Sequence, residues 1–263
     1  MTRIFTNAKR VPKDACPERV ASAPAPLLQF SRMLIMVDGI DGSGKSTVIE
    51  AWREALTKDG KKIFSVKEFC LTRGRLPLPE DAADADVIFS AEPTNVWIGA
   101  AIREEMIKSD ANYSAAAVAT AFSLDRLVLY SRFLNPARES GKFIIQDRGV
   151  SSSIAYQPIQ SPDIDLDFVL SLEGNKFAME HAPDVLFICN VSAEVAWKRL
   201  AERALKKDDA IFERREFLEK LVARYRSDWF RKLFESRGTK VVVFNGEADM
   251  DTMKEEAQKM LPL

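Results

Sequence analysis

The sequence predicts a doubly wound α/β fold, in which a parallel β-sheet is flanked by helices on both faces. Short apolar runs rich in β-branched residues alternate with longer amphipathic or alanine-rich stretches, the pattern of repeated strand–helix–strand units. The 263 residues are 46% hydrophobic and 29% charged, which is the composition of a globular protein able to bury such a sheet.

The elements follow one another along the chain as this fold requires. Residues 1–30 lack periodicity and predict a flexible leader without the apolar core of a secretory signal, and a single domain is expected over 31–263. Strands are predicted at 33–37, 62–66, 143–145, 185–189 and 241–244, with 87–89 as a sixth strand or part of the second. Helices are predicted at 45–57, 96–107, 115–139, 193–206, 212–236 and 250–260. A segment rich in proline, aspartate and alanine, at about 70–86, predicts an inserted loop.

Charge and apolar run length argue against binding to nucleic-acid polymers or membranes, and the cysteines bear on the cellular location. The 38 basic and 39 acidic residues give a net charge of −1, so no overall basic field favours a nucleic-acid polymer or an anionic membrane. The longest apolar runs are too short to span a bilayer. The three cysteines are widely spaced, which is typical of reduced thiols and predicts a cytoplasmic protein.

The first motif is the run GIDGSGKS at residues 39–46, which fits GxxxxGK[ST]. It follows an apolar strand and precedes a helical pattern, so its backbone N–H groups and the helix dipole are expected to bind phosphates; the alternative is an ordinary glycine-rich turn. Lys45 is predicted to bridge the β- and γ-phosphates of ATP, and Ser46 to ligate Mg²⁺. The predicted nucleotide-binding residues are Gly39, Asp41, Gly42, Ser43, Gly44, Lys45, Ser46 and Thr47. No Asn-Lys-x-Asp guanine-binding sequence is present, which argues against a GTPase.

A second candidate site follows the apolar run at 143–145. Asp147 stands at the carboxyl end of the predicted strand, where a carboxylate would lie beside the bound Mg²⁺. Arg148 comes next and is suited to an acceptor phosphate. The alternative is an ordinary acidic and basic pair at the surface end of a strand.

Three stretches together resemble the thymidylate kinase family. They are the loop GIDGSGKST, the segment Glu92-Pro93-Thr94 with Ile98-Gly99 following, and residues 125–157, which include DR and SSSIAYQ after the predicted strand. The resemblance covers roughly residues 33–260 and leaves out the leader and the 70–86 loop. It implies a fold of the P-loop nucleoside triphosphate hydrolase type with a helical lid. It also implies a homodimer that uses ATP and Mg²⁺ to phosphorylate the small molecule dTMP.

The resemblance also implies roles for particular residues. Phe122 would stack on the pyrimidine ring and Arg126 would bind its edge, although Phe122 alone could equally be a core aromatic residue on an alanine-rich helix. Asp41 would lie near the sugar 3′-hydroxyl. The remaining predicted acceptor residues are Glu92, Pro93, Arg103, Arg148, Ser152, Tyr156 and Gln157, with Tyr156 placed to exclude a ribose 2′-hydroxyl.

The basic stretch at about 199–215 is predicted to form the lid. In one branch of the family a catalytic arginine stands in the P-loop, where this chain has Gly42, so Arg199 or Arg203 is expected to stabilise the transferred phosphoryl group. The alternative for either residue is a solvated basic helix face. The predicted catalytic residues are Lys45, Asp41, Asp147, Arg148, Arg199 and Arg203, and the predicted metal ligands are Ser46 and Asp147.

Two positions depart from the family pattern and two other functions stay open. Ala91 replaces an arginine, whose phosphate contact would have to come from Arg73, Arg75 or Arg103, and Gly149 replaces an aromatic residue or histidine.

A deoxynucleoside kinase is one alternative function, because Glu92 and the later Trp97 also resemble that family, in which the carboxylate acts as a base. A catalytically silent nucleotide-binding module is the other.

Overall fold

The computed structural model describes residues 32–108, 110–204 and 215–261. Within them, six parallel strands form one sheet in the order β2-β3-β4-β1-β5-β6. The strands are β1 (Leu34–Asp38), β2 (Ile63–Ser65), β3 (Val87–Ala91), β4 (Phe143–Asp147), β5 (Val185–Asn190) and β6 (Lys240–Asn245). The predicted α/β class is therefore confirmed, and the run at 87–89 belongs to a strand of its own.

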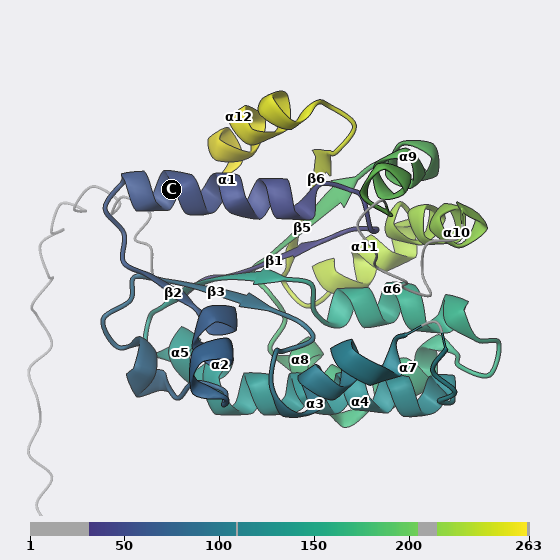
Figure 1. Cartoon of the computed structure of the whole chain (residues 1–263), viewed down its shortest axis with the longest axis horizontal. Coiled ribbons are helices and arrows are strands. Elements are labelled where there is room, and N and C mark those ends of the chain that lie inside the picture. Colours follow the sequence, from purple (N-terminus) through teal and green to yellow (C-terminus); the bar gives the residue numbers. More distant parts are fainter. Residues whose placement is uncertain (1–31, 109, 205–214, 262–263) are drawn as a thin grey trace, which may run out of the picture.

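Helices cover both faces of the sheet (Figure 1). One face carries α1 (Lys45–Lys58) and α12 (Met250–Met260). The other carries a larger set, drawn mostly below the sheet in Figure 1. Its main members are α2 (Val66–Arg73), α3 (Trp97–Ala101), α4 (Ala115–Leu129), α5 (Asn135–Glu139), α6 (Val150–Gln160), α7 (Leu166–Ser171), α8 (Glu173–Glu180), α9 (Ala193–Ala204), α10 (Arg215–Tyr225) and α11 (Asp228–Glu235).

The strands are apolar on both sides because both faces are covered. On β1, Ile35 and Val37 pack with α1 and α12, whereas Leu34 and Met36 pack with the helices of the opposite face. This is the period of two expected of a strand. Trp52 of α1 is fully buried, and its indole nitrogen donates to the carbonyl of Ala257 in α12 at 2.6 Å, which joins the two helices of that layer.

Three predicted helices are interrupted. The helix expected over 96–107 begins as α3 and continues as a π-helical stretch, η2 (Ile102–Met106). The helix expected over 115–139 contains a π-helical stretch, η3 (Tyr130–Leu134), between α4 and α5. The helix expected over 212–236 is divided into α10 and α11, because Ser227 adopts extended backbone and its hydroxyl donates to the carbonyl of Arg224 at the end of α10. Residues 212–214 of that prediction lie outside the described part.

The segment expected to be a loop at 70–86 has more structure than the sequence indicated. Helix α2 extends into it to Arg73, after Ser65 caps the amide of Glu68. A short 3₁₀ helix, η1 (Pro79–Ala82), follows, and Leu76 and Ala82 are buried in the core. Helices α6, α7 and α8 were also not predicted. No helix in the described part of the chain is both long and apolar enough to cross a membrane.

Candidate functional site

The candidate site lies where three neighbouring strands end. Residues of β1, β4 and β3 pair in register, with Val37 opposite Asp147 and Ala91 also opposite Asp147. Since the three strands are parallel, their carboxyl ends share one edge of the sheet, which is where α/β proteins bind ligands. The P-loop, the Asp147-Arg148 pair and the Glu92-Pro93 segment therefore converge.

The glycines of the P-loop are required by its backbone. Gly39, Gly42 and Gly44 have φ angles of 142°, 80° and 93°, a region that other residues rarely adopt. A Cβ on Gly39 would lie 2.5 Å from the carbonyl oxygen of Cys189, and one on Gly42 would lie 2.7 Å from that of Ala196. The loop is thus held closely between β5 and α9, and α1 begins directly after it.

Lys45 is the first residue of α1, and its side chain turns back to the loop. Its ammonium group donates to the carbonyl oxygens of Gly39 at 3.0 Å and Ile40 at 2.9 Å. Burial lowers the pKa of Lys45, as does Arg148, whereas Asp41 and Asp147 act in the opposite direction. The next side chain, Ser46, is exposed at the start of α1.

An ion pair joins the P-loop to the end of β4. The Arg148 guanidinium contacts the Asp41 carboxylate, donates to the Ser152 hydroxyl at 3.1 Å, and lies 5.3 Å from the centre of the Tyr156 ring. Burial tends to raise the pKa of Asp41, but Arg148 and Lys45 outweigh it and the pKa is lowered. Arg148 itself has a φ of 63°, an outlier of the kind that clusters at functional sites. Tyr156 donates to Asp41 at 3.4 Å.

A second carboxylate, that of Asp38, lies beside the ion pair of Asp41 and Arg148. The sequence analysis did not identify it. Asp38 is fully buried at the end of β1 and accepts from the amide of Gly39 at 2.8 Å, from the Ser152 hydroxyl at 2.8 Å, and from the Ser151 hydroxyl. Arg148 lies 3.7 Å away. The sequence signal was available, since an acid ends the first strand and a run of serines follows the fourth.

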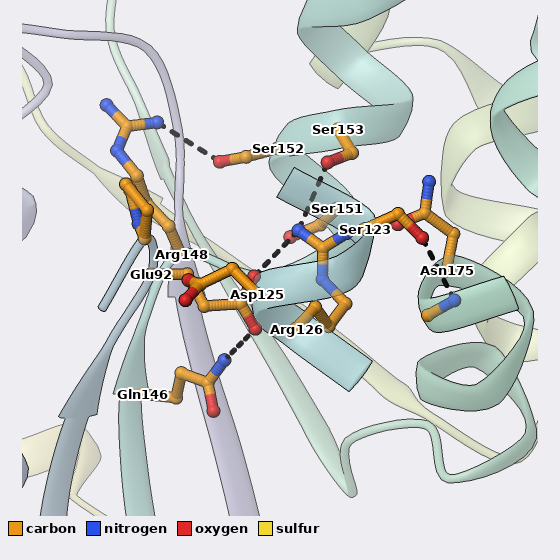
Figure 2. Close-up of polar contacts among 12 residues, drawn as sticks. Glu92, Ser123, Asp125, Arg126, Gln146, Arg148, Ser151, Ser152, Ser153 and Asn175 are labelled. Atoms are coloured by element: carbon orange, nitrogen blue, oxygen red, sulfur yellow. Dashed lines mark hydrogen bonds and ion pairs between the residues drawn. The ribbon is translucent and has the colours of Figure 1, made fainter. Parts of the chain in front are cut away.

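Glu92 leads a buried polar network (Figure 2). Its carboxylate pairs with Arg126 at 2.6 Å and accepts from the Gln146 amide at 2.7 Å. Burial raises the pKa of Glu92 to about 7, with Asp125 adding to the effect and Arg126 opposing it. The Glu92 carboxylate therefore makes these polar contacts with side chains of the protein itself.

Arg126 is almost inaccessible, at 1% exposure. Besides Glu92 it contacts the Asn175 amide oxygen from α8. It also donates to the Ser153 hydroxyl at 3.1 Å, as Figure 2 shows. Its Nε has no hydrogen-bond partner among the described residues. Gln157 donates to the same Ser153 hydroxyl at 3.2 Å, while Phe122 is half-buried one turn before Arg126 on α4.

Arg73, Arg75 and Arg103 are the three candidates for the phosphate contact that is missing at Ala91. Of these three, Arg103 lies at the site. Arg103 donates to the carbonyl oxygens of Pro93 at 2.9 Å and Thr94 at 3.1 Å, and it lies close enough to Asp147 and Arg148 to interact with their charges. Burial lowers its pKa. Arg75 instead pairs with Asp81 at 2.8 Å, and the exposed Arg73 also lies near that carboxylate.

Arg199 lies against the P-loop, but its guanidinium is committed to the backbone. It donates to the carbonyl oxygens of Gly42 at 3.3 Å, Gly246 at 2.6 Å and Ala248 at 2.9 Å. It therefore fastens the β6–α12 connection to the phosphate-binding loop, a role that sequence reasoning missed. The side chain of Arg203 lies outside the described part, as do residues 205–214 of the predicted lid.

The strand-end residues fit a magnesium ion that is held mainly by nucleotide phosphates. The Oδ1 atom of Asp147 is buried without a hydrogen-bond partner in the described part of the chain, and the Ser46 side chain is exposed. No cluster of three or more His, Cys, Asp or Glu side chains there could hold a metal by itself. Mg²⁺ commonly takes one or two protein oxygens and completes its shell with phosphate and water.

Gly149 has a steric explanation. A Cβ there would lie 2.4 Å from the terminal methyl group of Met36 and 2.7 Å from its sulfur. An aromatic residue or histidine at this position, as in the family pattern, would therefore require the end of the Met36 side chain, which is fully buried on β1, to move. Backbone bonds nevertheless hold the loop, since the amide of Arg148 donates to Val37 at 2.9 Å.

Comparison with known proteins agrees with this arrangement. The thymidylate kinase family model matches residues 78–257, a range that begins inside the 70–86 segment. A probable thymidylate kinase of Methanococcus aeolicus is 30% identical over 227 residues, which cover 86% of this chain and 94% of that protein. A probable thymidylate kinase of Methanosphaera stadtmanae is 32% identical, covering 73% and 82%, and a thymidylate kinase of Brachyspira hyodysenteriae is 28% identical, covering 88% and 96%. The P-loop sequence, the Asp147-Arg148 pair at the end of β4 and these matches lead to one conclusion: the chain belongs to the thymidylate kinase family.

Proposed function

We propose that this protein transfers the γ-phosphoryl group of ATP to the phosphate of dTMP, with Mg²⁺ bound to the nucleotide. The observation that carries the proposal is the contact between Asp41 and Arg148, because it joins a triphosphate-binding loop to an arginine suited to a second phosphate. Membership of the thymidylate kinase family supports dTMP as the acceptor.

On the donor side, the amides of residues 39–47 and Lys45 would bind the β- and γ-phosphates. Lys45 would exchange its bonds to the Gly39 and Ile40 carbonyls for phosphate oxygens. Ser46 and Asp147 would hold Mg²⁺, which supplies charge neutralisation when bound. Arg203 is proposed to contact the transferred phosphoryl group, with Arg199 keeping the loop in place.

On the acceptor side, Arg148 and Arg103 would bind the dTMP phosphate, and Asp41 would lie near the 3′-hydroxyl. Phe122 would contact the pyrimidine face, and the buried Nε of Arg126, which has no hydrogen-bond partner in the described part of the chain, is the group proposed for the base edge. The remaining contacts are proposed for Glu92, Pro93, Ser152, Tyr156 and Gln157. Tyr156 would exclude a 2′-hydroxyl; equal turnover of UMP and dUMP would contradict that role.

The test is an ADP-release assay with Mg-ATP against dTMP, dUMP, dCMP, dGMP, UMP and thymidine, with Lys45→Met as the inactive control. Selective turnover of dTMP supports the proposal. Turnover of thymidine alone would indicate a nucleoside kinase, and no turnover with any acceptor would indicate a silent module. The geometry disfavours the nucleoside kinase, since the Glu92 carboxylate needed as its base already binds Arg126 and Gln146.

We also propose a single kinase domain over 31–263, a cytoplasmic location and a homodimer. The exposed aromatic and aliphatic side chains Tyr113 and Leu124, at and near α4, support an interface there. Sedimentation velocity of the purified chain tests the dimer, which a monomeric value at micromolar concentration would contradict.

A further inference from the structure

Asp38 carries a buried carboxylate that the proposed mechanism does not use. The side chain is 0% exposed, so a bound nucleotide does not reach its oxygens in this conformation. Burying a carboxylate destabilises a fold unless hydrogen bonds and an opposite charge compensate it. The groups that surround Asp38 therefore indicate what this residue does.

The hydrogen bonds of Asp38 join the P-loop to the start of α6. The carboxylate accepts from the amide of Gly39, the first residue of the P-loop, at 2.8 Å. It also accepts from the hydroxyls of Ser151 and Ser152 in the first turn of α6, and the Ser152 oxygen lies 2.8 and 3.0 Å from its two oxygens. Asp38 thus fixes the beginning of α6, which closely follows Arg148, against the end of β1.

The opposite charge beside Asp38 is that of Arg148. One terminal nitrogen of the guanidinium lies 3.7 Å from the Asp38 carboxylate and donates to the Ser152 hydroxyl at 3.1 Å (Figure 2). Ser152 in turn donates to Asp38. The other terminal nitrogen contacts the Asp41 carboxylate. The guanidinium is therefore held between two carboxylates.

The two carboxylates differ in their access to a ligand. The Asp41 side chain is 32% exposed, and it is proposed to lie near the 3′-hydroxyl of the acceptor sugar. Asp38 is inaccessible, so its contacts do not compete with a ligand. Arg148 has a φ of 63°, a conformation that persists only where neighbouring groups hold the residue in place. Asp38 is the holding carboxylate that a bound nucleotide does not displace.

We propose that Asp38 is a positioning residue for the acceptor phosphate. It holds one terminal nitrogen of Arg148, directly and through Ser152, so that the other can bind the phosphate when Asp41 turns to the sugar. Without the Asp38 charge, Asp41 would be the remaining ion-pair partner of Arg148 among the described residues, and the phosphate would have to compete with that pair. This inference rests on the proposed function, because that function assigns Arg148 to the acceptor phosphate.

The first experiment compares binding of dTMP and thymidine, which differ only in the phosphate, to wild type and Asp38→Asn by NMR titration. Asparagine keeps the shape of the side chain and an oxygen for the Gly39 amide but removes the charge. We expect the ratio of dTMP affinity to thymidine affinity to fall about tenfold, with the affinities for thymidine and ATP within about twofold. A general disturbance of the site would weaken thymidine equally. An unchanged or higher ratio would overturn the proposal.

The second experiment leaves Asp38 in place and compares Ser151→Ala with Ser152→Ala. Each variant removes one hydroxyl that donates to Asp38 from the first turn of α6, but only Ser152 also accepts from Arg148. We expect Ser152→Ala to lower the ratio of dTMP to thymidine affinity about fivefold, and Ser151→Ala to leave it within about twofold. Equal falls in both variants would overturn the role through Ser152, since they would mean that Asp38 only holds α6.

The third experiment is a double-mutant cycle with Arg148→Ala. That substitution should lower the ratio by itself, and Asp38→Asn should then have no further effect. A further change would overturn the proposal, because the Asp38 charge would be acting on the phosphate without Arg148. A ratio that Arg148→Ala leaves unchanged would contradict the phosphate-binding role of Arg148 under the proposed function. A ratio that falls in Arg148→Ala but not in Asp38→Asn would refute the role of Asp38 alone.

Discussion

The carboxylate of Glu92 and the guanidinium of Arg126 form an ion pair of 2.6 Å in which both side chains are nearly inaccessible to water, at 3% and 1% exposure. Two effects compete at this pair. Arg126 favours the ionised carboxylate, whereas burial disfavours it. Burial is the larger effect, and the pKa of Glu92 rises from 4.5 to about 7.

The first prediction concerns stability against pH. Because the folded state binds the Glu92 proton more tightly than the unfolded state, this residue contributes stability that is fully present below about pH 4.5 and is lost as pH rises towards 7. Urea unfolding of wild type and Glu92→Gln between pH 4.5 and 8 should show wild type losing stability relative to the variant over that range. Glu54→Gln, which removes an exposed partner of Lys254, is the control and should follow wild type. A relative gain by wild type with rising pH would mean that Arg126 dominates.

The second prediction concerns magnesium. Asp147→Asn should raise the Mg²⁺ concentration needed for half-maximal ADP release by about 10- to 100-fold, because a neutral amide replaces the carboxylate that is proposed to hold the ion. No hydrogen bond of the Oδ1 atom of Asp147 is lost within the described part, so any fall in stability should be small and should come from its charge interactions with Lys45 and Arg103. Asp86→Asn is the matched control. The Asp86 carboxylate is exposed, accepts from the Lys62 amide, and lies just before β3, at the amino end of that strand. The same Mg²⁺ dependence in both variants would remove Asp147 from the metal site.

The third prediction concerns the space at Gly149. Gly149→Ala should lower the free energy of unfolding by about 1–2 kcal/mol, because its Cβ overlaps the Met36 side chain. The backbone φ of Gly149 is extended, so steric overlap is the only cause invoked. In a Met36→Val background the same substitution should be less destabilising, as measured by urea unfolding of all four proteins. Equal losses in the two backgrounds would contradict the overlap.

The fourth prediction concerns Arg199. Arg199→Ala removes three hydrogen bonds to backbone carbonyls and should destabilise the protein by about 2 kcal/mol. Since the P-loop loses its link to the β6–α12 connection, KM for ATP should rise more than kcat falls. Steady-state kinetics and urea unfolding check the two effects. Unchanged stability and KM with a large fall in kcat would instead support the catalytic role expected from the sequence.

The local parts of the site could be predicted from the sequence because their signals are local. The P-loop needs glycines at fixed spacing between a strand and a helix, and Asp147 ends an apolar run. The catalytic and binding roles assigned to these residues stay predictions. Placing their ends together required only that the strands be parallel.

The buried network could not be predicted in the same way. Arg126 meets Ser153 and Asn175, which are 27 and 49 residues away, and no periodicity encodes such a meeting. Helix α6, which supplies Ser153, begins with small polar residues and contains Pro158, so intrinsic preference argued against it. The partners of Arg199 are backbone carbonyls, which have no sequence signature at all.

The pairing of β1 with β4 has one further consequence. The P-loop follows one of these strands and Arg148 follows the other, and neighbouring strands are spaced about 4.8 Å apart by their hydrogen bonds. The sheet thus sets the distance between the loop proposed to bind the donor phosphates and the arginine proposed to bind the acceptor phosphate. Under the proposed function, this distance is determined when the protein folds, and little further loss of entropy is needed to align two nucleotides for transfer.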